Sequence, residues 1–142
     1  MNKRTGTALW QGSGKEGKGN LSTQSQILNK APYSWSSRFA EAPGTNPEEL
    51  IAAAHAGCFT LKLSFVLGEA GFTPEAIETT STVTIDTGNI TTSHLVVNAK
   101  VPGISKEKFE ECVKNAKDNC PVSKVLKAEI TYEAMLTEKA FA

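Results

Sequence analysis

The chain has 142 residues, of which 39% are hydrophobic and 21% charged. This length and composition are typical of one globular domain with a single core, so we expect one domain over residues 1–142. The 15 basic and 15 acidic side chains cancel, which gives no reason to expect nucleic acid or an anionic membrane surface as a partner.

The first 30 residues are polar and contain two strand-like stretches, residues 5–10 and 20–26. The glycine-rich segment 12–19 lies between them, as expected for the turn of a hairpin. The same composition also suits a disordered tail, and that alternative stays open at this point.

A long helix is expected from Pro47 to about Glu69. Asn46 is a favourable N-cap, Pro47 suits the first helical position, and the two glutamates that follow favour the positive end of the helix dipole. Gly71 is suited to end the helix. Residues 52–58 are almost all small, so another backbone can approach closely, and we place this helix at the centre of the structure.

The second half of the chain alternates between strands and helices. Apolar residues recur at every second position in residues 83–85 and 95–101, and the turn between these strands contains Gly88. The other expected elements are a helix over residues 105–118, a short helical stretch over 121–126 and a closing strand over 127–136.

The three cysteines, Cys58, Cys112 and Cys120, are too few for a disulfide framework. We find no secretory signal and no apolar run near the roughly 18 residues of a membrane span, so we expect the cytoplasm, where thiols stay reduced. Cys112 shares the apolar face of its helix with Phe109, which favours core packing. Cys120 precedes Pro121. It is either the cap of a short helix whose free amides stabilise its thiolate or an incidental loop cysteine.

Cys58 lies in the middle of the long helix, where we expect no helix N-terminus near enough to lower the pKa of its thiol. A nucleophilic Cys58 therefore needs a cation from elsewhere. Arg38 is one of only two arginines, although an isolated arginine is usually a solvated surface charge. His55 is a base for the thiol, half of a metal site, or a helix histidine with a local hydrogen bond. The last is favoured, and no metal is expected because a structural zinc needs four ligands.

Two stretches of the chain resemble the motifs of a known family. They are GTNPEELIAAAHAGCF at residues 44–59 and NCPVSK at residues 119–124. Both resemble the OsmC (osmotically induced protein C) family, sister to the Ohr (organic hydroperoxide resistance) proteins. His55 and Arg38 favour the OsmC branch. The resemblance covers nearly the whole chain and implies an α+β, OsmC-like fold of antiparallel sheets with a long central helix.

The resemblance also implies a function, the reduction of organic hydroperoxides to alcohols in defence against oxidative or osmotic stress. By motif position, Cys58 resembles the peroxidatic cysteine and Cys120 the resolving one. Arg38 resembles the activating arginine, and Glu48 the carboxylate that holds it. No cofactor is implied, because an external dithiol, such as a lipoyl-bearing protein, would reduce the Cys58–Cys120 disulfide. The alternatives are a non-catalytic binding protein of the same fold and a general thiol–disulfide oxidoreductase.

Helix geometry adds a constraint on such a site. Cys58 follows Glu48 on one helix by about 15 Å along the axis and about 80° around it. One guanidinium can hardly reach both residues in one chain, so we expect an intertwined homodimer whose sites combine the glutamate and cysteine of different subunits. The Arg38–Glu48 pair is expected to be bidentate. Phe39 and Phe59 are expected to line the peroxide pocket.

Overall fold

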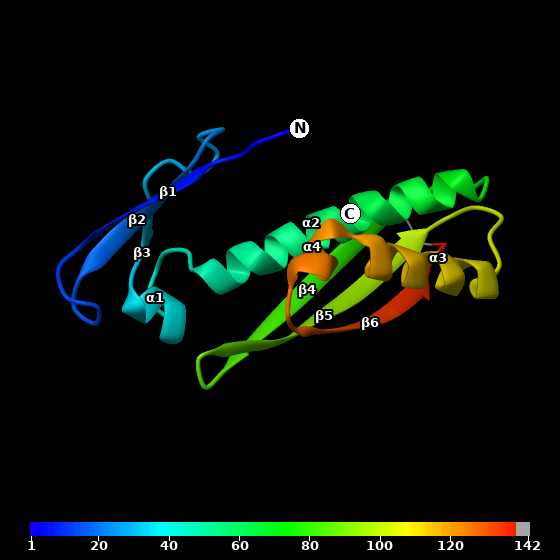
Figure 1. Ribbon diagram of the computed structural model, residues 1–142. Coiled ribbons are helices and arrows are strands. Elements are labelled where there is room, and N and C mark those ends of the chain that lie inside the picture. Colours follow the sequence, from blue (N-terminus) through cyan, green and yellow to red (C-terminus); the bar gives the residue numbers. More distant parts are fainter. Residues whose placement is uncertain (139–142) are drawn as a thin grey trace. The chain divides into compact units, whose positions relative to one another are not determined.

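The computed structural model describes residues 1–138, which divide into two compact units (Figure 1). The first unit is Met1–Leu50, and the second begins at Ile51. Each unit has its own three-stranded sheet, and the two are described separately below.

The first unit contains an antiparallel sheet in the order β1-β2-β3. Gly12 in the turn between β1 and β2 has a φ of +99°, and a Cβ on Gly17 would clash with the carbonyl oxygen of Ser13. The expected hairpin is therefore confirmed, and the alternative of a disordered tail is wrong. Sequence reasoning missed β3 and α1, because elements this short carry no readable period. The elements are β1 (Gly6–Gln11), β2 (Lys18–Thr23), β3 (Ala31–Tyr33) and α1 (Trp35–Phe39).

The long helix α2, Pro47–Glu69, has the predicted bounds. Its N-cap is Asn46, whose Oδ1 accepts the N–H of Glu49 at 2.8 Å. Beyond its last turn, Gly71 has a φ of +92°, which an L side chain rarely adopts. Local capping chemistry therefore determines both ends of this helix.

The second unit contains a sheet in the order β4-β5-β6. Its β4 (Ala76–Asp86) and β5 (Asn89–Lys100) form an antiparallel hairpin, whereas β6 (Glu129–Leu136) runs parallel to β5. The expectation of purely antiparallel sheets is therefore wrong for this last pair. The helices α3 (Lys106–Asn119) and α4 (Pro121–Val125) return the chain to the start of β5, so β6 runs in the same direction.

One face of this second sheet packs against α2 and α3 (Figure 1). Along β5 the buried positions alternate as the sequence predicts, with Leu95, Val97 and Ala99 fully buried. Cys112 is 3% exposed and joins the same core, which confirms its packing role. The helices contribute the buried apolar side chains Phe59, Leu63, Leu67, Phe109, Val113 and Ala116.

Helix α2 is long and apolar enough, by length and composition alone, to cross a membrane. This finding corrects the expectation that no apolar run approaches the required length. Phe59 and Leu63 of α2 lie in the core of the second unit, as in the core helix of a globular protein. Only 28% of the apolar window of α2 is buried, however. Much of its apolar surface is therefore left uncovered within residues 1–138.

Candidate active site

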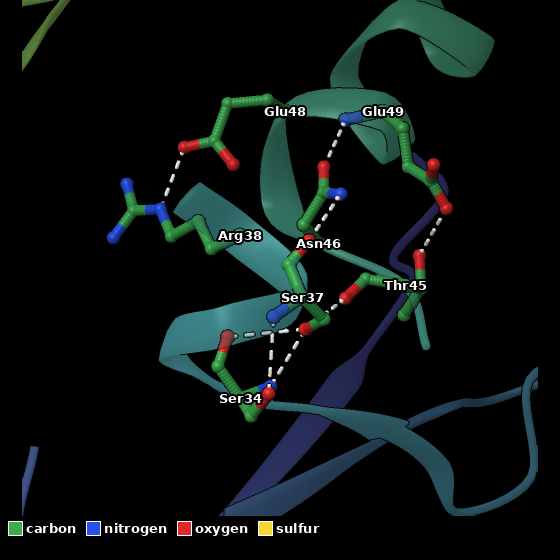
Figure 2. Close-up of polar contacts among 7 residues, drawn as sticks. All are labelled: Ser34, Ser37, Arg38, Thr45, Asn46, Glu48 and Glu49. Atoms are coloured by element: carbon green, nitrogen blue, oxygen red, sulfur yellow. Dashed lines mark hydrogen bonds and ion pairs between the residues drawn. The ribbon is translucent and has the colours of Figure 1, made fainter. Parts of the chain in front are cut away.

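The first half of the candidate site lies in the first unit, where Arg38 and Glu48 form an ion pair. Arg38 Nε donates to Glu48 Oε1 at 2.7 Å, and the Glu48 side chain is only 11% exposed (Figure 2). The arginine comes from α1 and the glutamate from the first turn of α2. The structure thus brings these two sequence-predicted residues together within one unit.

A hydrogen-bond network ties α1 to the start of α2 (Figure 2). Ser34 caps α1: its Oγ accepts the Ser37 N–H at 3.1 Å, and its own N–H donates to Ser37 Oγ at 2.7 Å. The buried Ser37 Oγ also donates to the carbonyl of Thr45 at 2.9 Å. Asn46 Nδ2 donates to the carbonyl of Ser37 at 3.0 Å. These bonds hold the guanidinium opposite the carboxylate.

The contact between Arg38 and Glu48 is a single hydrogen bond, not the bidentate contact expected. Within residues 1–138, Nε is the Arg38 atom that bonds the carboxylate. The second carboxylate oxygen, Glu48 Oε2, is buried there without a hydrogen-bond partner. Because Nε makes this contact, the terminal nitrogens of Arg38 can bind another oxygen.

An aromatic pocket of about 200 Å³ adjoins Arg38. The guanidinium carbon lies 4.8 Å from the ring centroid of Phe39, a cation–π contact. Phe39 lines this pocket, whereas Phe59 is fully buried in the core of the second unit. That these two rings line the peroxide pocket stays a prediction. The other aromatic walls of the pocket are Trp10, Tyr33 and Trp35.

The second half of the candidate site lies in the second unit, where Cys58 on α2 is half-buried. Burial raises the pKa of the Cys58 thiol, and a hydrogen bond with the Cys120 thiol raises it further. The backbone N–H of Val122 and the charge of Lys62 lower this pKa, but the balance stays above the ordinary thiol value. The second unit by itself therefore keeps Cys58 protonated near neutral pH.

The structure brings Cys58 and Cys120 together, although one lies on α2 and the other between α3 and α4. Cys120 is fully buried and makes no side-chain cap bond to α4. The backbone N–H of Val122, in α4, instead forms a hydrogen bond with the sulfur of Cys58. The expectation that no helix start lies near Cys58 is therefore wrong, because α4 is remote in sequence but adjacent in the fold.

His55 lies one turn before Cys58, and both of its ring nitrogens are bonded elsewhere. Nδ1 is 2.6 Å from Ser93 Oγ, and Nε2 is 2.7 Å from Ser123 Oγ. Ser93 Oγ is in turn 2.9 Å from Ser81 Oγ. These partners are distant in sequence, so the expected local hydrogen bond is wrong, and neither ring nitrogen is left to act as a base for the thiol.

Sequence reasoning missed Ser93, Ser123 and Val122. A signal for Ser93 was present, because it precedes Leu95 by two positions and shares the buried face of β5. A serine in an apolar register needs a buried polar partner. Ser123 and Val122 lie inside the NCPVSK stretch, but their residue types alone carry no signal of a contact with His55 or Cys58.

Residues 40–134 match the sequence model of the family described as OsmC-like protein. The chain belongs to the OsmC family. Among its OsmC relatives, peroxiredoxin OsmC of Escherichia coli (strain K12) is 50% identical over 137 residues, which are 94% of this chain and 96% of that protein. Organic hydroperoxide resistance protein-like 1 of Staphylococcus epidermidis is 32% identical over 95 residues, 64% of this chain and 68% of that protein.

Solved structures agree with this family assignment. The organic hydroperoxide resistance protein OhrB of Bacillus subtilis has 27% identity and a TM-score of 0.67, over 92% of this chain and 98% of that one. An OsmC-like protein from Mycoplasma pneumoniae has a TM-score of 0.75 over 96% of this chain and 99% of that one, at 14% identity, which bears on the fold alone. The expected family and the α+β, OsmC-like fold with a long helix are therefore confirmed.

Proposed function

We propose that this OsmC-family chain is a cysteine-dependent peroxidase that reduces organic hydroperoxides to alcohols in stress defence. The observation that carries the proposal is the meeting of the Cys58 and Cys120 thiols inside one unit. A peroxidase of this kind needs a second thiol within reach of the first. The relative named peroxiredoxin OsmC, which matches nearly the full chain, supports the same chemistry.

The cycle uses only thiol chemistry and needs no cofactor. The Cys58 thiolate attacks the distal peroxide oxygen, the O–O bond breaks, and the alkoxide leaves as an alcohol after it takes a proton. Cys58 is then a sulfenic acid. The Cys120 sulfur attacks the Cys58 sulfur, which forms a disulfide and releases water. An external dithiol, for which a lipoyl-bearing protein is one candidate, reduces the disulfide and restores both thiols.

The Arg38–Glu48 pair is proposed to supply the activation that the second unit lacks. Cys58 has a raised pKa in its own unit, so an efficient nucleophile requires a nearby cation. Arg38 bonds Glu48 through Nε, so its terminal nitrogens can hold both a thiolate and a peroxide oxygen. The aromatic pocket beside Arg38 supports an organic substrate over hydrogen peroxide.

We propose that this pair acts on the Cys58 of a second subunit, in a homodimer. Two apolar side chains of α2, Leu61 and Phe65, are 61% and 64% exposed, and such a surface on a core helix calls for a partner. Beside Leu61, an open groove of about 580 Å³ between α2 and β4 is lined by small residues that include Ala56 and Gly57. Groove and apolar side chains together fit a second copy of the helix.

The peroxidase proposal is tested by consumption of cumene hydroperoxide with a dithiol. Wild type and Cys112→Ser should consume the peroxide at similar rates, whereas Cys58→Ser should be inactive. Cys120→Ser should accumulate a Cys58 sulfenic acid that a dimedone-type probe labels. Equal consumption by wild type and Cys58→Ser would refute the proposal. Disulfide exchange without peroxide consumption would favour a general thiol–disulfide oxidoreductase.

The composite site is tested by mixing two inactive variants. Arg38→Met and Cys58→Ser are co-expressed with different tags, and the doubly tagged species is purified. If sites combine Arg38 of one subunit with Cys58 of the other, each heterodimer regains one of two sites and about half of the wild-type activity. If each site lies within one chain, the heterodimer stays inactive. A monomeric wild type in sedimentation would also contradict the proposal.

Cytoplasmic location is part of the same proposal. A cycle that ends with reduction by an external dithiol is favoured in a compartment that keeps thiols reduced, as the cytoplasm does. Cell fractionation with an antibody against the chain would test it.

A further inference from the structure

A polar chain with a buried centre links the sheet of the second unit to α4. It runs from Ser81 on β4 through Ser93 on β5 and His55 on α2 to Ser123 on α4, with successive contacts of 2.9, 2.6 and 2.7 Å. His55 and Ser93 are both fully buried. A buried polar network of this kind is retained only if its members are satisfied, and here each link is made.

The imidazole of His55 bonds as a neutral group. Burial lowers its pKa below the ordinary histidine value, so the ring has one N–H and one lone pair near neutral pH. One serine hydroxyl accepts from the ring and the other donates to it. Ser93 is anchored in the middle strand of the sheet, so the imidazole is a fixed point from which Ser123 is held.

The segment that contains Ser123 is attached to the core at Cys120, which is fully buried, and at Val122, which packs against the core. Helix α4 has five residues, none of them buried, and its N-cap Cys120 makes no side-chain cap bond. Val125 of α4 is 77% exposed. Yet this segment carries both groups that meet the Cys58 sulfur, the Cys120 thiol and the Val122 N–H. The bond from His55 to Ser123 adds to these core contacts a polar anchor at the residue next to Val122.

We propose that His55 is a positioning residue for disulfide closure, which holds Ser123 so that Cys120 and the Val122 amide stay against Cys58. The inference rests on the proposed peroxidase function. It concerns the step in which the Cys120 thiol attacks the Cys58 sulfenic acid, forms the S–S bond and releases the oxygen as water. His55 transfers no proton to the reacting sulfurs, because both of its nitrogens are engaged by serines.

The test separates the two chemical steps in Ser123→Ala, with Ser123→Thr as the conservative variant and Lys124→Ala, at the exposed neighbouring residue of α4, as control. Each protein is mixed rapidly with cumene hydroperoxide and quenched, and Cys58 sulfenic acid and disulfide are measured by mass spectrometry. Ser123→Ala should close the disulfide about tenfold more slowly, the effect of one lost hydrogen bond, while sulfenic acid forms within about twofold of wild type. Ser123→Thr and Lys124→Ala should close it like wild type.

A second readout needs no peroxide. The pH midpoint for alkylation of Cys58 should move to higher pH in Ser123→Ala, because the Val122 N–H no longer stabilises the thiolate as well. Unchanged closure and midpoint in Ser123→Ala overturn the inference, as does equal slowing of both steps or failure of Ser123→Thr to restore closure. If wild type forms no disulfide, the peroxidase proposal fails, and the alkylation midpoint still decides whether His55 and Ser123 hold Val122.

Discussion

The role of Glu48 can be tested by substitution, because the neighbouring Glu49 provides a matched control. Glu48→Gln keeps the side-chain shape and removes the negative charge that orients Arg38 through the 2.7 Å bond to Nε. A hydrogen bond to a charged group contributes about 1.5–3 kcal/mol and a neutral one about 0.5–1.5 kcal/mol. Since Arg38 is 39% exposed, solvent screening favours the low end, a loss of about 1 kcal/mol. The kcat/KM for cumene hydroperoxide should fall about five- to tenfold.

Glu49→Gln is the control for this variant. Glu49 lies in the same first turn of α2, so both substitutions remove one negative charge from the same end of the helix dipole. Glu49 is exposed and accepts a hydrogen bond from Thr45, with no bond to Arg38. Its loss should change kcat/KM less than about twofold, as for a surface charge. The reasoning is refuted if Glu48→Gln retains wild-type kcat/KM, or if both variants are impaired equally.

Three further predictions concern stability. Gly44→Ala should lower the free energy of unfolding by more than about 1 kcal/mol, because φ is +118° and a Cβ would lie 2.6 Å from the Pro32 carbonyl oxygen. The control is Gly68→Ala, on α2, where an added Cβ meets no atom within 4 Å; it should leave the stability unchanged or raise it. Cys112→Ala should cost about 1–2 kcal/mol in urea unfolding and leave peroxide consumption unchanged; loss of consumption would contradict its packing role. Burial lowers the pKa of His55. Its neutral form therefore stabilises the fold above the ordinary histidine pKa, and that contribution is lost as the pH falls through the lowered value. Between pH 8 and 5, the urea midpoint should fall less in His55→Gln than in wild type.

Local chemistry made part of the fold predictable. Asn46 and Gly71 mark the ends of α2 because caps and left-handed glycines act on neighbouring backbone groups. The alternation along β5 predicted which side chains are buried. The parallel pairing of β5 with β6 was not predictable in this way, because a strand's direction in a sheet depends on where the preceding crossover brings the chain, and not on the strand's own residues.

The candidate site was likewise predictable from the sequence only in part. The residue types by themselves, with their resemblance to the OsmC motifs, led to the four side chains that we propose carry the chemistry: Cys58, Cys120, Arg38 and Glu48. Only the tertiary structure decided what acts on them. Cys58 meets the amide of Val122 and the thiol of Cys120, both far along the chain, and its pKa follows from that burial and those contacts. A pKa is set by neighbours in space, and no spacing along one helix reveals which neighbours a distant segment will bring.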